Sequence, residues 1–250
     1  MSTEQQPVPD GWATCSRPIA LVTGASRGIG LAVARDLARD HHVLVGGTNR
    51  ETVEAVVAEM DTVESRQAWP FVADLTDRDA LVGTLDALGL TRLDVLVHSA
   101  GIAEYGPIAD SDPAMWQRTF DLNVFAVAEL TRLVLPMLRR SKGQVVLINS
   151  GAGHNASPNS GVYAASKFAL RALGDSLRAE EREQVRVCSI HPGRVDTDMQ
   201  RELQASLGND DYRGEKYVRP ETIAAAVRLA VDAAPQAMVE EVIVRPVIAG

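Results

Sequence analysis

Tyr163 and Lys167 are the residues whose types and spacing most directly suggest chemistry. They lie four positions apart in residues 161–170, a stretch whose alanines and leucine favour a helix through both. Residues i and i+4 share one face of a helix, so a phenol and an ammonium are placed side by side. A nearby ammonium favours the phenolate and lowers the tyrosine pKa from its usual value of about 10. The pair therefore predicts a proton donor and acceptor, although an ordinary amphipathic helix with a surface lysine explains the same spacing.

Short apolar runs alternate with amphipathic segments along the rest of the chain. We expect strands at 19–23, 42–46, 67–73, 93–98, 144–149, 185–190 and 241–245, with helices between them, including a long one at 116–139. The strands are continuously apolar, as in sheets that are covered on both faces. This alternation predicts an α/β fold, a Rossmann-like doubly wound parallel sheet of about seven strands with helices on both faces. Cofactor and substrate should bind beyond the carboxyl ends of the strands.

Length and composition describe one globular domain. The 250 residues are 46% hydrophobic and 23% charged, and the net charge of −8 argues against nucleic acid as a partner. We expect a flexible tail over residues 1–17, a single domain over 18–250 and a short substrate lid at about 198–219. Cys15 falls in the tail and Cys188 in a strand, so no disulfide is expected. The absence of a signal-like or membrane-spanning apolar run predicts a cytoplasmic protein with no membrane partner.

A glycine-rich turn follows the first expected strand. Gly24, Gly28 and Gly30 precede a helix, and glycine allows a pyrophosphate to approach the backbone N–H groups at the helix start. The spacing G-x-x-x-G-x-G meets the general dinucleotide fingerprint only in part, so a purely structural turn is the alternative.

The end of the second expected strand bears on cofactor choice. It reads Gly46-Gly-Thr-Asn-Arg50 and carries no acid to hold a ribose 2′-hydroxyl. Arg27 and Arg50, with Asn49, could instead face a 2′-phosphate. This predicts that NADP(H) is favoured and that NAD(H) remains possible, unless both arginines are ordinary surface charges.

Two polar residues lie where a catalytic site would need them. Asn123 shares a helical stripe with Val127, Leu130 and Val134, so it points toward the core, where an amide needs a partner such as a water leading to Lys167. Ser150 ends the fifth expected strand, and its hydroxyl can donate to an oxygen that gains charge. A satisfied core asparagine and a plain turn serine are the alternatives.

Taken together, these residues resemble the short-chain dehydrogenase/reductase family, in its plain-length single-domain subclass. The resemblance rests on residues 23–30 (TGASRGIG), 163–167 (YAASK), 98–101 (HSAG) and 192–197 (PGRVDT), in the right order and spacing. One departure is His98-Ser99, where the family commonly has two asparagines; we expect His98 to be a structural replacement rather than a catalytic base.

The resemblance implies roles for individual residues. The catalytic residues that it implies are Asn123, Ser150, Tyr163 and Lys167. The cofactor-binding residues expected from the resemblance and from the end of the second strand are Gly24, Ser26, Arg27, Gly28, Ile29, Gly30, Asn49, Arg50, Asp74, Leu75, Ala100, Gly101, Tyr163, Lys167, Pro192, Gly193, Val195 and Thr197. Tyr163 would exchange the proton, while Lys167 lowers its pKa and binds the ribose. His41, His42, His154 and His191 show no metal-ligand grouping, so no metal is expected.

The expected reaction is hydride transfer between NADP(H) and a small ketone, aldehyde or alcohol. Residues 152–156 with Glu104 and Tyr105 should line the substrate side, without a clear charge signature. The ending Val242-Ile-Val-Arg-Pro246 resembles members that act on small hydroxy acids or their semialdehydes. A 3-oxoacyl-type reductase and a catalytically silent dinucleotide-binding sensor or scaffold are the alternatives. A homodimer or homotetramer is expected, because Val127, Phe168 and Leu177 add apolar surface to two helices that pair in the family.

Overall fold

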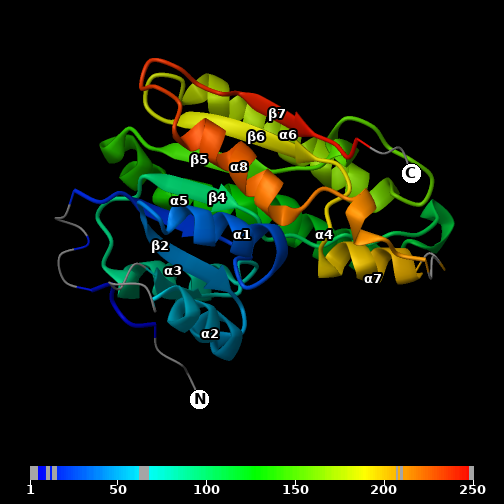
Figure 1. Ribbon diagram of the computed structural model, residues 1–250, viewed down its shortest axis with the longest axis horizontal. Coiled ribbons are helices and arrows are strands. Elements are labelled where there is room, and N and C mark those ends of the chain that lie inside the picture. Colours follow the sequence, from blue (N-terminus) through cyan, green and yellow to red (C-terminus); the bar gives the residue numbers. More distant parts are fainter. Residues whose placement is uncertain are drawn as a thin grey trace.

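A single seven-stranded parallel sheet organises the molecule, with the strand order β3-β2-β1-β4-β5-β6-β7 (Figure 1). The computed structural model describes residues 5–9, 12, 16–61, 68–206, 208 and 211–247. The strands are β1 (Ile19–Val22), β2 (His42–Gly47), β3 (Ala68–Val72), β4 (Val95–His98), β5 (Gln144–Ile148), β6 (Arg186–Pro192) and β7 (Glu241–Val244). The predicted doubly wound sheet is confirmed, and Cys15 lies outside the described residues.

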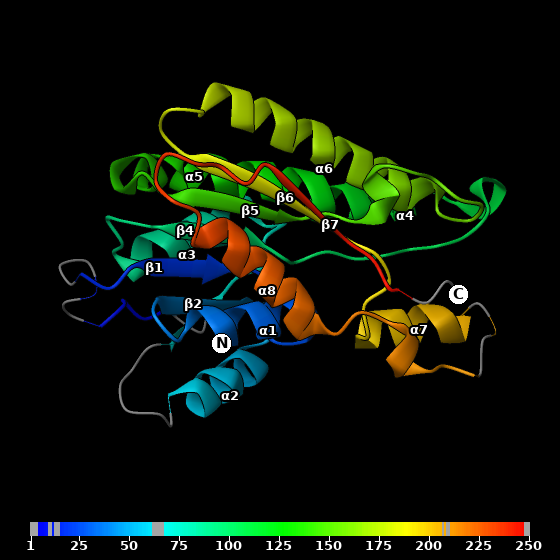
Figure 2. The same cartoon turned by 45° about the horizontal axis from the view of Figure 1, so that its top comes forward.

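Helices connect the strands and cover both faces of the sheet (Figure 2). They are α1 (Gly28–Leu37), α2 (Arg50–Met60), α3 (Arg78–Leu88), α4 (Pro113–Phe120), α5 (Ala126–Ser141), α6 (Gly161–Glu180), α7 (Asp198–Ser206) and α8 (Pro220–Val231). Short helical turns are η1 (Ile108–Asp110), η2 (Asp121–Phe125), η3 (Gly151–Gly153) and η4 (Gly214–Lys216). None of the helices within the described ranges has the length and apolar run that a bilayer would require.

Each strand contributes to two cores because successive side chains point to opposite faces. In β1, Ala20 and Val22 pack with α1, α2 and α8, whereas Ile19 and Leu21 pack with α3, α5 and α6. All four are buried. The need to fill both sides explains why the strands read as continuous apolar runs rather than as an alternation.

The long helix expected at 116–139 is interrupted in the structure. A π-helical turn, η2, separates α4 from α5, and Asn123 lies buried within it. A π turn inserts one extra residue per turn and shifts the faces of the two flanking helices relative to one another. The periodicity of the sequence did not show this insertion, because the apolar stripe continues on both sides of it.

The apolar surface expected for self-association is also different. Val127 and Leu177 are buried in the core, while Phe168 is 42% exposed and Phe125, which follows Asn123 in the π turn, is 55% exposed. Both residues had been taken as surplus, but the helix faces that pack on the sheet need them to fill the core. The homodimer or homotetramer therefore stays a prediction that rests on a smaller exposed surface.

Two described residues of the expected tail pack against β3 and β2. The Gln5 side chain donates to the Pro70 carbonyl (2.8 Å) and accepts from the Val72 N–H (3.3 Å), so it covers the free edge of β3. Pro70 itself suits an edge strand, where its missing N–H costs no ladder bond. Trp12 is buried and stacks on His42 with 4.2 Å between ring centroids. These contacts were not predicted from the polar, proline-containing sequence.

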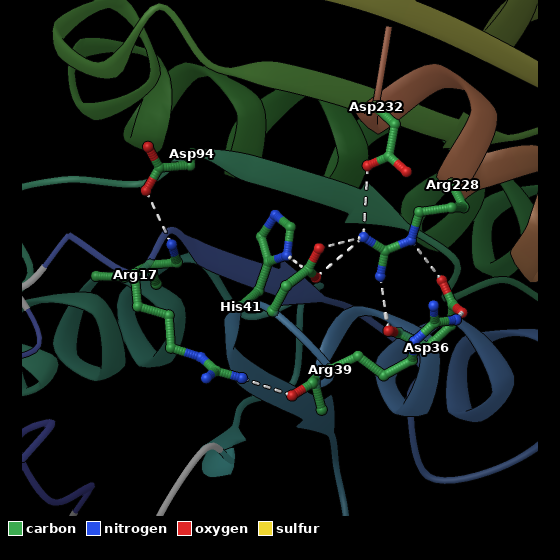
Figure 3. Close-up of polar contacts among 10 residues, drawn as sticks. Arg17, Asp36, Arg39, His41, Asp94, Arg228 and Asp232 are labelled. Carbon is green, nitrogen blue, oxygen red and sulfur yellow. Dashed lines mark hydrogen bonds and ion pairs between the residues drawn. The ribbon is translucent and has the colours of Figure 1, made fainter.

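A network of ion pairs joins the end of α1 to α8 (Figure 3). The Arg228 guanidinium donates to the Asp36 carboxylate (2.8 Å), to the Asp36 carbonyl (2.6 Å) and to the Asp40 carboxylate (2.7 Å). Burial raises the pKa of Asp40, but hydrogen bonds from Arg228 and His41 outweigh it and hold the pKa below its ordinary value. The side chain of Arg228 is only 15% exposed. It therefore donates to a carbonyl at the end of α1 and to three carboxylates, the third being that of Asp232 at 3.4 Å.

The substitution Arg228→Met should destabilise the fold while keeping most of the apolar stem. Loss of the guanidinium leaves Asp36 and its carbonyl without this donor, which we expect to cost about 2 kcal/mol of unfolding free energy. Arg35→Met is the matched control, because the Arg35–Glu59 pair is largely exposed and should contribute less than about 1 kcal/mol. Urea unfolding followed by circular dichroism measures both. Equal stabilities of the two variants would contradict a structural role for the network.

Candidate active site

The site begins where the order of the strands reverses, between β1 and β4. Thr23 follows β1, and its Oγ1 accepts the N–H groups of Ser99 and Ala100, both at 3.1 Å. Gly24 adopts φ +62, and a Cβ there would lie 2.8 Å from the Ala100 Cα. Only glycine allows this approach of two backbones. In open α/β sheets, a reversal of this kind opens the crevice in which ligands bind.

The glycine-rich turn leads directly into α1. A Cβ on Gly30 would lie 2.2 Å from the Gly24 carbonyl oxygen, so this position also requires glycine. Arg27 precedes the helix without a side-chain hydrogen bond to its first N–H groups. A helix start that lacks a capping side chain offers N–H donors and a partial positive charge to an anion. The turn thus fits the pyrophosphate of a dinucleotide.

A cavity of about 380 Å³ lies over this turn. It is lined by 13 of the residues predicted from the sequence, namely Gly24, Ser26, Arg27, Gly28, Ile29, Gly30, Asp74, Leu75, Ala100, Gly101, Tyr163, Lys167 and Thr197. It also includes residues that were not predicted, among them Thr23, Gly46, Gly47, Thr48, Phe71, Ala73, Thr76, Ser99, Ile102, Leu122, Ile148, Asn149, Asp198 and Met199. Nine of these fourteen residues are among the last two of a strand or directly follow one, a position that the sequence already indicated.

Asn49 and Arg50, in contrast, do not line this cavity. The Asn49 Oδ1 accepts the Thr52 N–H at 3.0 Å and so caps α2. The first residue of that helix, Arg50, pairs with Glu54 at 2.9 Å. The requirements of the helix start therefore account for both residues, and Thr48 occupies the place at the end of β2 that we had assigned to them.

Tyr163 and Lys167 lie together on α6, as predicted. The Lys167 Nζ is 5.7 Å from the centre of the Tyr163 ring and donates to the Ile148 carbonyl at 3.2 Å. Burial raises the pKa of Tyr163, and a hydrogen bond with Ser150 acts in the opposite direction. Burial lowers the pKa of Lys167 to about 8. The spacing predicted a lowered pKa, whereas in this structure burial of the phenol outweighs the hydrogen bond with Ser150 and holds the pKa of Tyr163 above its ordinary value.

Asn123 joins α6 to the segment that follows β4. Its Nδ2 donates to the Ile102 carbonyl (2.9 Å) and to the Ser166 Oγ (3.0 Å), while its Oδ1 accepts the Ile102 N–H (3.0 Å). A Cβ on Gly101 would lie 3.0 Å from this Oδ1 and 3.9 Å from the Lys167 Nζ. The amide is satisfied by protein groups and holds the backbone beside Lys167 in place.

His98 braces β4 against α5. Its Nε2 lies 2.9 Å from the Thr131 Oγ1, and burial lowers its pKa to about 3, which keeps the ring neutral. This supports the interpretation of His98 as a structural replacement, and the helix partner is a residue that the sequence did not indicate.

A second cavity adjoins the first and provides space for a substrate. The two share Ile29, Asn149, Tyr163, Thr197 and Met199. The second also contains Tyr105, Ser150, Ala152 and Asn155, as predicted, and the predicted cofactor residues Pro192, Gly193 and Val195. Gly153, His154 and Ala156 do not line it, and Glu104 instead accepts hydrogen bonds from Arg118 and Thr119.

The same cavity carries positively charged side chains that were not expected from the sequence. Arg194 and Arg245 both line it. The Arg245 guanidinium lies 3.5 Å from where a Cβ on Gly151 would be, and Arg194 stacks on Tyr217 with 5.2 Å to the ring centre. Within the described residues, neither arginine forms an ion pair with a carboxylate.

The segment expected to be a lid contains α7 and η4. Met199, Gln200 and Leu203 of α7 contribute to the second cavity. Asp196, just before α7, accepts from Arg201 (2.8 Å) and from the Tyr212 Oη (2.9 Å), which ties two points of the segment to the residue before α7. Residues 207, 209 and 210 lie outside the described residues.

The structure also brings together a set that the sequence analysis did not group. His154, His191 and Glu241 lie with their ligand atoms within 4.8 Å of one another. The sequence analysis did not find this group, because the adjacency of β6 and β7 unites residues that are far apart in the chain.

The fold, the glycine turn and the paired cavities define a dinucleotide-dependent oxidoreductase. The profile of the short chain dehydrogenase family matches residues 18–208. The chain belongs to this family and is an enzyme acting on CH–OH or C=O groups with NAD(P).

Relatives and solved structures agree with this assignment. Glycine betaine reductase of Emericella nidulans is 33% identical over 96% of this chain, which corresponds to only 19% of that longer protein. An alcohol dehydrogenase from Thermococcus sibiricus, complexed with 5-hydroxy-NADP, has a TM-score of 0.83 and 27% identity over 93% of this chain and 98% of its own. A closed serine dehydrogenase complexed with NADP+ has a TM-score of 0.80 and 26% identity over 90% and 94%.

Proposed function

We propose that this protein is an NADP(H)-dependent oxidoreductase that interconverts a small ketone or aldehyde and its alcohol, with Tyr163 as the acid or base. The observation that carries the proposal is that Tyr163 lines both cavities, so its phenol lies where cofactor and substrate would meet. Ser150 is hydrogen bonded to it and Lys167 lies on the same helix face.

Each of these residues has a definite task. NADP(H), when bound, supplies or accepts the hydride. Tyr163 gives its proton to the carbonyl oxygen in reduction and takes it back from the alcohol in oxidation. Ser150 donates to the same oxygen as charge develops on it. Lys167, buried and cationic below a pKa of about 8, favours the phenolate and offers donors to ribose hydroxyls.

Replacement of Tyr163 by Phe tests this assignment. The variant lacks the transferable proton, so we expect turnover to fall by about 100-fold or more while NADPH binding is kept. Tyr105→Phe is the comparison, because its ring lies 5.5 Å from that of Tyr163 and lines the same cavity. Turnover with a carbonyl panel and NADPH fluorescence measure the two effects. A larger loss in Tyr105→Phe would move the acid to that residue.

The preference for NADP(H) rests on the end of β2 and on Arg27. Gly46, Gly47 and Thr48 line the cavity there and supply no carboxylate to repel a 2′-phosphate. The Arg27 side chain is 61% exposed and has only a 3.5 Å contact with Glu202, so it is available to an anion in the same cavity. The NADP-type ligands in the two related structures support the same preference.

Wild-type protein should therefore show higher kcat/KM with NADPH than with NADH. Arg27→Gln should lower the NADPH value by about tenfold, the effect of about 1.4 kcal/mol, and should change the NADH value little. Arg35→Gln, within the helix that Arg27 precedes, is the control, since neither Arg35 nor its partner Glu59 lines the cavity. Equal efficiency of NADH in the wild type would overturn the preference.

The substrate is proposed to carry a carboxylate. Arg194 and Arg245 line the substrate cavity and have no carboxylate partner among the described residues, and a guanidinium matches a carboxylate in shape and charge. Arg245 belongs to the chain ending that resembles members acting on hydroxy acids. A related structure is a serine dehydrogenase, whose named substrate is itself a hydroxy acid. A 3-oxoacyl thioester remains the alternative substrate within this reaction class.

Comparison of a short oxo acid with its methyl ester separates the effect of the substrate's charge from the effect of its shape. We expect the acid to have the lower KM, and Arg245→Gln to raise that KM about tenfold while leaving the ester unaffected. Arg182→Gln is the control, because Arg182 pairs with Glu240 away from the cavity. If the ester is the better substrate and Arg245→Gln affects neither, the carboxylate proposal fails while the oxidoreductase assignment stands. Tight NADPH binding without turnover of any carbonyl would instead favour the silent sensor.

A further inference from the structure

The cluster of His154, His191 and Glu241 is formed by three separate elements. Glu241 begins β7 and His191 lies near the end of β6, where the register pairs Ser189 with Glu241 and His191 with Ile243. Alternate residues of a strand share a face, so Glu241 and Ile243, and with them His191, point to the same side. His154 reaches this side from the end of η3, after β5, which is the other neighbour of β6.

All three side chains converge on one point. The Nε2 of His191 lies 2.8 Å from the Glu241 Oε1, and the Nε2 of His154 lies 3.0 Å from the same oxygen. The two imidazole rings are 4.2 Å apart between centroids. The His191 side chain is fully buried, while those of His154 and Glu241 are 18% and 39% exposed. The cluster is thus closed on one side and open to solvent on the other.

The imidazole nitrogens of the cluster differ in whether they have a hydrogen-bond partner. The Nδ1 of His191 lies 3.1 Å from the Ser150 carbonyl oxygen, which can only accept, so Nδ1 carries the proton. With the proton on Nδ1, a neutral ring has its lone pair on Nε2. That lone pair faces a carboxylate oxygen, which is also an acceptor. Among the described residues, the Nε2 atoms of His154 and His191 have no partner with hydrogen-bond geometry.

We propose that His154, His191 and Glu241 form a binding site for a divalent transition metal of the zinc class. A cation is bound by lone pairs that are directed at one point, and the three side chains supply them. Zn²⁺ uses two imidazoles and one carboxylate as a ligand set, with a fourth position left for water. A metal-bound histidine characteristically donates its other N–H to a backbone carbonyl, as His191 does to Ser150. Mg²⁺ and Ca²⁺ prefer oxygen ligands and fit this set poorly.

The surrounding charges are compatible with such a cation. Glu241 supplies one negative charge in the cluster. Arg171 of α6 is the cation that acts on His191, but it lies 3.9 Å from Asp175, which partly neutralises it. A bound metal would tie β6 and β7 to the turn after Ser150, and its link to the proposed catalytic residues is the Ser150 backbone.

The test uses untagged, full-length protein that has been stripped with a chelator. Co²⁺ is added at pH 7.5, and its visible absorption reports coordination by nitrogen and oxygen ligands; Zn²⁺ then competes in calorimetry. We expect one equivalent of Co²⁺ to bind, Zn²⁺ to displace it, and Zn²⁺ to raise the melting temperature. Glu241→Gln and His154→Asn should each weaken binding by more than about tenfold, since even the loss of an outer-shell partner has an effect of this size.

Glu240→Gln is the matched control, because this neighbouring glutamate pairs with Arg182 on the surface and should leave metal affinity unchanged. The fully buried His191 is left intact, and His154→Asn carries the test alone if Glu241→Gln does not fold. Binding that neither variant weakens would place the metal elsewhere and overturn the proposal. Absence of saturable Co²⁺ and Zn²⁺ binding in the wild type would overturn it as well.

Discussion

The contact between the turn after β1 and the start of the segment after β4 is the constraint on which the site depends. Thr23 accepts two backbone N–H groups from Ser99 and Ala100, and Gly24 has no room for a side chain. These contacts hold the two halves of the sheet together where their connections diverge. The cofactor cavity is the space left above this junction, and both the glycine turn and Tyr163 face it.

Most of the fold was predictable because its determinants are local. The apolar runs are long enough to mark strands, and the order of motifs identifies the glycine turn and the Tyr163 helix. The expectations that changed depend on how segments pack. Arg50 was assigned by its place after β2; in the structure it lies in the first turn of α2 and pairs with Glu54, so its role at the cofactor stays a prediction. Val127 and Leu177 look like surplus apolar residues until the second core is seen to require them.

The electrostatics of the site were the least predictable part. Spacing alone places an ammonium near a phenol, and that part is confirmed. The sign of the net pKa shift depends on how much water the fold removes, which no local pattern records. Likewise, the positive charge in the second cavity arises because the residues after β6 and β7 bring Arg194 and Arg245 to one place. The grouping of His154, His191 and Glu241 depends on the same adjacency.

The Gln5 amide on β3 has a consequence for how molecules of this protein can meet. An unpaired outer strand is a template onto which a second chain can add its own strand. Here one side chain occupies a donor and an acceptor of that strand, and Pro70 removes another donor. Growth of the sheet from one molecule into the next is blocked along this edge. The homodimer or homotetramer that the sequence predicts would therefore need another surface, and Phe125 and Phe168 are exposed apolar side chains away from β3.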